Sequence, residues 1–64
     1  MSKSKEIELA KKIKKLRSML GMTQEQFAAR VGVTFSTVNR WENGKSKPSP
    51  LAVARMEVLQ AKLR

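Results

Sequence analysis

Residues 23–44, TQEQFAARVGVTFSTVNRWENG, constrain the fold of this chain more than any other stretch. Phe27, Ala28 and Val31 follow helical spacing, so they predict a short helix with one inward face. Gly32 follows directly, where an abrupt turn favours a residue that is free to adopt a positive φ. The stretch therefore begins as a helix of about two turns that stops at a tight turn.

The ends of this helix and of the next one carry recognisable capping signals. Thr23 and Gln26 have the spacing of a capping box, and Thr34 is a suitable N-cap for a second helix. The pair Asn43-Gly44 then predicts that the second helix stops there. Helices over about 24–31 and 35–42 joined by a tight turn are the layout of a helix-turn-helix, whose second helix enters the DNA major groove.

The remaining segments also favour helices. Apolar residues at helical spacing (Leu9, Ile13, Leu16 and Leu20) predict a helix over about 4–20, preceded by disorder at residues 1–3. Ser49 and Pro50 predict the start of a last helix over about 50–63. We therefore expect residues 1–64 to form a single all-α domain of four helices, or of five if the last helix bends near Glu57.

The last helix has more apolar residues than one buried stripe requires. The surplus, Val58 together with Leu59 or Leu63, is consistent with a partner surface and hence with a homodimer formed through this helix. Incidental exposure of a few apolar side chains explains the surplus equally well, so both interpretations stay open.

These features together resemble the lambda-repressor-like (Cro/Xre-type) family of helix-turn-helix DNA-binding domains. The resemblance covers roughly residues 9–60. It rests on Leu16-Arg17 before Gly21, Thr23-Gln24, Ala28, Gly32-Val33, Thr37-Val38 and the run from Arg40 to Lys45. It implies a compact all-α domain and a sequence-specific regulator of transcription, acting as a repressor on double-stranded DNA.

In the resembled family, outward-facing residues of the second motif helix reach base edges. The matching candidates here are Phe35, Ser36, Thr37, Asn39 and Arg40. Arginine can bond guanine and asparagine can bond adenine in bidentate fashion, whereas hydroxyl groups are adaptable. Arg40 has a phosphate contact as its alternative. Phe35 departs from the polar or basic residue common at this position. It either touches a thymine methyl group or packs against Val38 or against the face of the helix over about 24–31.

The resemblance also implies contacts with the DNA backbone and one structural ion pair. Gln24 would bind a phosphate at the start of the first motif helix, unless it is simply solvated. Asn43, Lys45 and Lys47 match further backbone contacts in the loop after the second motif helix. Arg17 and Glu42 match a partly buried ion pair that joins the first helix to the end of the recognition helix. We expect Trp41 to be a core residue.

Composition agrees with a polyanionic partner. The chain has 14 Lys and Arg against 5 Asp and Glu, a formal net charge of +9, so its DNA affinity should fall steeply with salt. It has no Cys and no His, which argues against disulfides, metal sites, cofactors and histidine catalysis, so we do not expect an enzyme. Because it has no leader-like or membrane-spanning run, we expect a cytoplasmic protein. The resemblance implies a nucleoid-associated protein of a bacterium, phage or plasmid.

Three other functions remain open at this point. The same fold can act as an adaptor that binds protein, or as the antitoxin of a toxin–antitoxin pair whose free apolar surface holds the toxin. A basic helix alone could bind nucleic acid or an anionic membrane without specificity, although such a peptide would not require caps, a turn glycine and an interior tryptophan.

Overall fold

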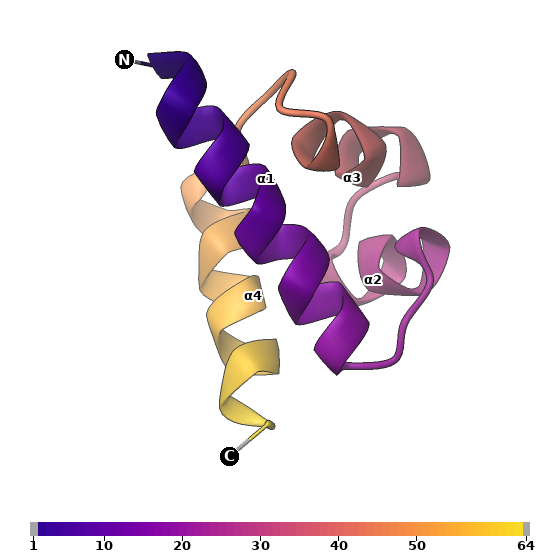
Figure 1. The fold of residues 1–64 in the computed structure, drawn as a ribbon. Coiled ribbons are helices and arrows are strands. Elements are labelled where there is room, and N and C mark those ends of the chain that lie inside the picture. The colour runs from indigo at the N-terminus through magenta and orange to yellow at the C-terminus, as the bar shows by residue number, and fades with distance from the viewer. Residues whose placement is uncertain (1, 64) are drawn as a thin grey trace.

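Four helices pack around one small core in the computed structural model, which describes the backbone of residues 2–63 and the side chains of residues 5–63. They are α1 (Ser2–Met19), α2 (Gln24–Val31), α3 (Phe35–Glu42) and α4 (Pro50–Ala61). The long α1 runs diagonally across the molecule, with α2 and α3 on one side of it and α4 on the other (Figure 1). Helix α3 packs against both α1 and α2, and α2 also packs against α4. The expected all-α fold is therefore confirmed, with four helices in the described part of the chain.

The helix ends follow the local chemistry of the sequence. Thr23 Oγ1 accepts a hydrogen bond from the Gln26 backbone N–H at 3.1 Å, and the Gln26 side chain accepts one from the Thr23 N–H at 2.9 Å. This reciprocal pair is the predicted capping box, and it satisfies two donors that a helix start leaves unpaired. The side chains of Thr34 and Ser49 cap α3 and α4 in the same manner. The residues singled out as caps thus fix where three of the helices begin.

Gly32 makes the turn between α2 and α3. Its φ of +85° lies in the left-handed region, which costs an L residue roughly 1–2 kcal/mol and glycine almost nothing. Its N–H donates to the Ala28 carbonyl at 2.8 Å, and the Val33 N–H donates to the same carbonyl at 2.9 Å. The chain therefore leaves α2 within a single residue and enters α3 at a fixed angle.

The core lies where the four helices meet. Phe27, Val31 and Val38 are its largest fully buried side chains, and Trp41 is 3% exposed. The predicted apolar stripe of α1 faces this core, with Ile13 buried and Leu9, Leu16 and Leu20 partly buried against it. The inward faces predicted for α1, α2 and α3 are confirmed.

Two expectations were wrong. Residues 2 and 3 are helical, because α1 begins at Ser2 rather than after a disordered segment; Met1 lies outside the described residues. Leu59 does not belong to an exposed surplus, because it is 5% exposed and packs in the core with Ala52 and Met56. The exposed apolar residues of this region are instead Leu51, Val53, Val58 and Leu63.

Candidate nucleic-acid interface

Helix α3 buries one side and presents the other to solvent. Val38 and Trp41 form the buried side, which anchors the helix to the core. The exposed side carries Phe35, Ser36, Asn39 and Arg40. The α2–α3 turn fixes the direction of this helix, so the four exposed side chains project as one rigid group rather than from a mobile loop.

Phe35 opens α3 with its ring only partly covered. It retains 48% of its surface exposed and is not a member of the buried core. About half of the ring is therefore accessible to a contact outside the chain. Ser36 and Arg40 lie on the same solvent-facing side of the helix.

Thr37 is less available than the other base-reading candidates. It is half-buried, and its hydroxyl lies 2.9 Å from the hydroxyl of Thr34. Its backbone N–H also donates to Thr34 Oγ1, at 3.3 Å. Thr37 therefore takes part in the N-terminal cap of α3, and its hydroxyl would have to leave that cap to meet a base.

Asn39 and Asn43 are linked at the other end of α3. The Asn43 side-chain amide donates to the Asn39 carbonyl at 2.7 Å and to Asn39 Oδ1 at 3.2 Å. The amide group of Asn43 therefore caps α3, and a phosphate contact by this group requires the side chain to rotate. Asn39 keeps its own amide group as an outward donor, while its oxygen is shared with Asn43.

Arg17 and Glu42 form a two-pronged ion pair that joins α1 to the end of α3. Arg17 Nε donates to Glu42 Oε2 at 2.7 Å, and Arg17 Nη2 donates to Oε1 at 3.1 Å. The remaining terminal nitrogen of Arg17 donates to the Met22 carbonyl at 3.0 Å. The two side chains are 18% and 5% exposed, so water screens the pair only weakly.

Gln24 belongs to the same network. Its Nε2 donates to Glu42 Oε1 at 3.0 Å. An ionised carboxylate can only accept hydrogen bonds, so this contact fixes which end of the Gln24 amide faces Glu42. The second hydrogen of that amide group is left for a ligand at the N-terminus of α2, where unpaired backbone N–H groups and the helix dipole favour an anion.

The surroundings of Glu42 keep it ionised. Burial alone would raise the pKa of its carboxyl group, but the hydrogen bonds from Arg17 and Gln24 and the positive charges of Arg17 and Lys14 outweigh burial. The pKa of Glu42 is therefore lower than its ordinary value of 4.5. The hydrogen bond with Glu42 in turn raises the pKa of Arg17, against an opposing effect of burial. Both members of the pair are thus charged at neutral pH.

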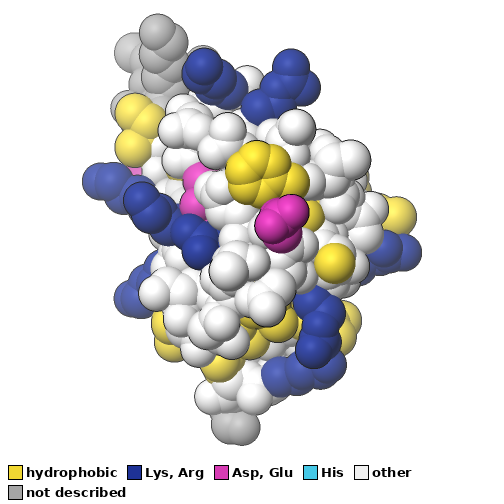
Figure 2. All heavy atoms as spheres, turned by 90° about the vertical axis from the view of Figure 1, so that its right-hand side faces the viewer, with side chains coloured by type: hydrophobic (Ala, Val, Ile, Leu, Met, Phe, Trp, Pro, Cys, Tyr) yellow, Lys and Arg dark blue, Asp and Glu magenta, His cyan; other side chains and the backbone are white. Residues whose placement is uncertain are grey.

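Positive charge lies on several sides of this face. Figure 2 shows the side that carries α2 and α3, with Lys and Arg side chains near its edges and, between them, mostly uncharged side chains and an acidic side chain beside an apolar one. Lys45 and Lys47, in the loop after α3, are both exposed. A basic periphery suits a ligand whose phosphates flank a central groove.

The structure also reveals a residue that sequence reasoning missed. Arg55 of α4 donates from Nη1 to the carbonyl of Val31, the last residue of α2, at 3.1 Å. A Cβ atom built on Gly32 would collide with the same nitrogen, so the Arg55 side chain lies directly over the turn. No local pattern around Arg55 indicates this contact, because it joins residues 24 positions apart.

The fold and the exposed helix α3 define a helix-turn-helix domain. A family model described as helix-turn-helix matches residues 13–59, which include all of α2 and α3. This chain belongs to that family, the Cro/Xre-type helix-turn-helix domains of DNA-binding transcription regulators. The family is typically non-enzymatic.

One protein similar to this chain is an uncharacterized HTH-type transcriptional regulator of Methanothermobacter thermautotrophicus, which is 43% identical over 44 residues. The matched stretch is 69% of this chain and 64% of that protein, so the chain covers less than two thirds of the relative's length. No solved structure matches the chain. Within residues 2–63, no helix is long and apolar enough to cross a membrane.

Proposed function

We propose that this protein is a sequence-specific regulator of transcription that inserts α3 into the major groove of double-stranded DNA and represses by occupying an operator. The observation that supports this most directly is the exposed side of α3, which carries base-reading residue types on a helix anchored by Val38 and Trp41. The printed name of the relative, a transcriptional regulator, points the same way.

Each exposed side chain of α3 contacts a different base. Arg40 offers a bidentate donor for guanine, and Asn39 offers its outward amide group for adenine. Ser36 supplies an adaptable hydroxyl, and Phe35 contacts a thymine methyl group. Each good bidentate pair discriminates against a wrong base by about 1–3 kcal/mol. Thr37 contributes to reading only after its hydroxyl leaves the α3 cap.

The DNA backbone is held at both ends of the motif. Gln24 donates to a phosphate from the start of α2 while its contact with Glu42 keeps the side chain in place. Lys45 and Lys47 bind phosphates beyond the end of α3, and Asn43 joins them when it rotates out of its cap. These contacts set the register of the protein on DNA without reading sequence.

A homodimer formed through α4 would double the contact with DNA. Leu51 and Val58 are seven residues apart, hence on one face of the helix, and are 63% and 61% exposed. Two copies would then read half-sites roughly 34 Å apart, about one helical turn of DNA. Such a regulator would work in the cytoplasm, associated with the nucleoid.

In vitro selection from a random duplex library at physiological salt tests this function. Enrichment of an inverted repeat with half-site centres about 10 bp apart supports a dimeric operator binder. A single enriched half-site supports sequence reading by a monomer and argues against the dimer. Salt-sensitive binding without any enriched sequence contradicts the proposal.

A matched pair of variants distinguishes base contacts from phosphate contacts. Arg40→Ala should flatten the base preference at one position of the enriched site, whereas Lys45→Ala should weaken all sequences alike and reduce the salt slope by about one. If Arg40→Ala also weakens all sequences alike, Arg40 is a phosphate contact instead.

A further inference from the structure

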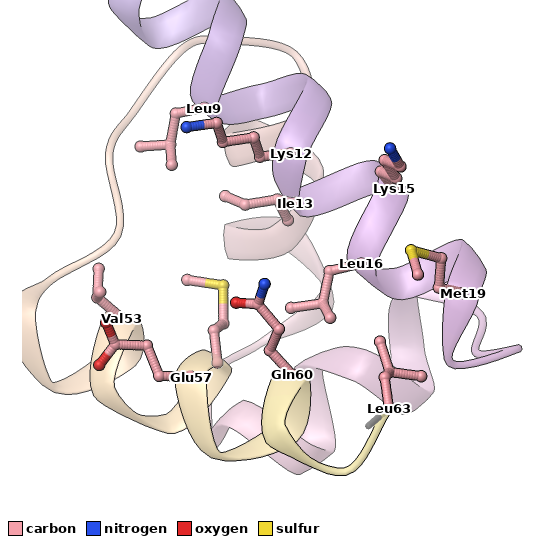
Figure 3. Close-up of a pocket in the computed structure, with 11 residues that line it drawn as sticks. Leu9, Lys12, Ile13, Lys15, Leu16, Met19, Val53, Glu57, Gln60 and Leu63 are labelled. Carbon is pink, nitrogen blue, oxygen red and sulfur yellow. The ribbon is translucent and has the colours of Figure 1, made fainter.

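A groove runs between α1 and α4 on the other side of α1 from α2 and α3 (Figures 1 and 3). Its volume is about 720 Å³. Apolar side chains from both helices line it: Leu9, Leu16 and Met19 from α1, Val53 and Met56 from α4, and Leu63 just beyond α4. The helix-turn-helix does not use any of these residues to face DNA, so the groove is a separate surface.

The described part of the chain leaves this groove open. Met19 is 58% exposed, Val53 is 37% exposed and Leu63 is 38% exposed. The groove extends along α1 from Leu9 to Met19, a distance of ~15 Å at a rise of 1.5 Å per residue. That length corresponds to about three turns of a second helix lying alongside.

The two edges of the groove differ in charge. Lys12 and Lys15 stand on the α1 side, three residues apart and therefore neighbours on the helix surface, and both are exposed. Glu57 and Gln60 stand on the α4 side. Within residues 5–63 the only ion pair is that of Arg17 with Glu42, so both lysines are available to a ligand.

We infer that this groove binds an amphipathic helix of a different protein, with an apolar stripe against the groove floor and acidic residues along the flank that meets Lys12 and Lys15. The floor accepts apolar side chains spaced at i, i+3 or i+4, and i+7, as in other helix-in-groove complexes. The two lysines select acidic residues on one flank and thereby fix the direction in which the helix lies.

Charge complementarity favours a different chain over a second copy of this one. The chain has 5 Asp and Glu against 14 Lys and Arg, so a second copy offers few acidic residues to the flank formed by Lys12 and Lys15.

Synthetic peptides of about 14 residues test the proposal with the intact chain. One peptide has Leu at the i, i+3 or i+4, and i+7 positions and Glu along one flank; the other is identical except for Lys in place of Glu. Titrations by calorimetry and by amide chemical shifts should show saturable binding of the acidic peptide, with shifts in α1 and α4. The lysine peptide should bind at least about tenfold more weakly. Equal affinities, no binding, or shifts confined to α3 would overturn the proposal.

Variants at exposed positions complete the test. Lys15→Glu and Met19→Ser should each weaken the acidic peptide by about tenfold. The matched controls Lys11→Glu and Ile7→Ser make similar changes at exposed residues that do not line the groove, and should change its affinity by less than about twofold. A dimer in sedimentation that Met19→Ser dissociates would assign the groove to a second copy and overturn the proposal. All these measurements are made without DNA, so they and the DNA selection can fail independently.

Discussion

Gln24 and Glu42 are hydrogen bonded at 3.0 Å, which ties the first residue of α2 to the last residue of α3. Glu42 is held in turn by Arg17 from α1. The side chain proposed to bind a phosphate is thus fixed by the end of the helix proposed to read bases. Contact with the backbone and contact with the bases are therefore placed relative to each other before DNA arrives, which limits the entropy lost on binding.

Removing the side chain of Gln24 should weaken DNA binding without changing specificity. Gln24→Ala loses a hydrogen bond donated to a charged phosphate, which corresponds to about 1.5–3 kcal/mol of binding free energy. Affinities for the selected site and for an unrelated duplex should fall by the same factor in a fluorescence titration. Gln60→Ala, a change at an exposed glutamine on α4, should alter neither. A loss confined to the selected site would show that Gln24 reads sequence.

Breaking the Arg17–Glu42 pair from one side should be more destabilising than removing both partners. Arg17→Met leaves the carboxylate of Glu42 buried without its partner, and we expect the free energy of unfolding to fall by about 3–5 kcal/mol. The double variant Arg17→Met with Glu42→Leu should recover part of that loss. Urea denaturation followed by Trp41 fluorescence measures both. A loss below about 1 kcal/mol in the single variant would place the pair among weak surface pairs.

Glu42 should make stability depend on acidity in a defined direction. Its pKa in the folded protein is lower than the ordinary value of 4.5, so the unfolded chain takes up a proton first as the pH falls. The contribution of Glu42 is therefore fully present above about pH 4.5 and is lost as the pH falls through the folded pKa. Urea midpoints measured from pH 7 downward should show this loss in the parent protein and a smaller one in Glu42→Gln. Equal losses in the two proteins would contradict it.

Alanine should be tolerated less well at Gly32 than at Gly21. Both glycines have positive φ, +85° and +68°, so each substitution carries a similar backbone cost of roughly 1–2 kcal/mol. A Cβ atom at Gly21 meets nothing within 4 Å, whereas one at Gly32 displaces the guanidinium group of Arg55 and so breaks its hydrogen bond to the Val31 carbonyl. Gly32→Ala should therefore show the larger drop in melting temperature. Adding Arg55→Ala should destabilise the Gly32→Ala protein less than it destabilises the parent; equal effects would mean that the collision costs nothing.

Phe35→Ala should separate DNA affinity from stability. Because the ring is 48% exposed and lies outside the core, the melting temperature should remain nearly unchanged. The binding free energy for the selected site should weaken by roughly 1 kcal/mol, which is the lower end of the cost of one mismatched base pair. Met19→Ala, at a similarly exposed apolar residue away from α3, should leave DNA affinity unchanged. A large drop in melting temperature would instead identify Phe35 as a packing residue.

Local rules were enough to predict the helices and most of the core. The caps and the turn depend on contacts within a few residues of chain, so sequence spacing alone predicts them at Thr23, Thr34 and Gly32. The helical repeat of apolar residues alone predicts that Phe27 and Val38 face inward. The prediction for Leu59 was wrong because the helical repeat of apolar residues defines the faces of a helix but not which of two apolar faces meets the core. That choice depends on how the helices cross.

The network around the candidate interface was only partly predictable. The resemblance to a known family implied that Arg17 meets Glu42, but nothing local indicated that Gln24 joins them from 18 residues away. The contact of Asn43 with Asn39 spans four residues, so helical spacing could have predicted it. Whether these side chains touch DNA depends on a ligand that the sequence does not contain, so their assignments rest on the experiments above.

The hydrogen bond from Arg55 to the Val31 carbonyl connects α4 directly to the turn between α2 and α3. Helix α4 also forms one wall of the α1–α4 groove. If a helix entering the groove displaces α4 and with it the α2–α3 turn, DNA affinity changes. Linkage then requires DNA to alter the affinity of that helix by the same factor.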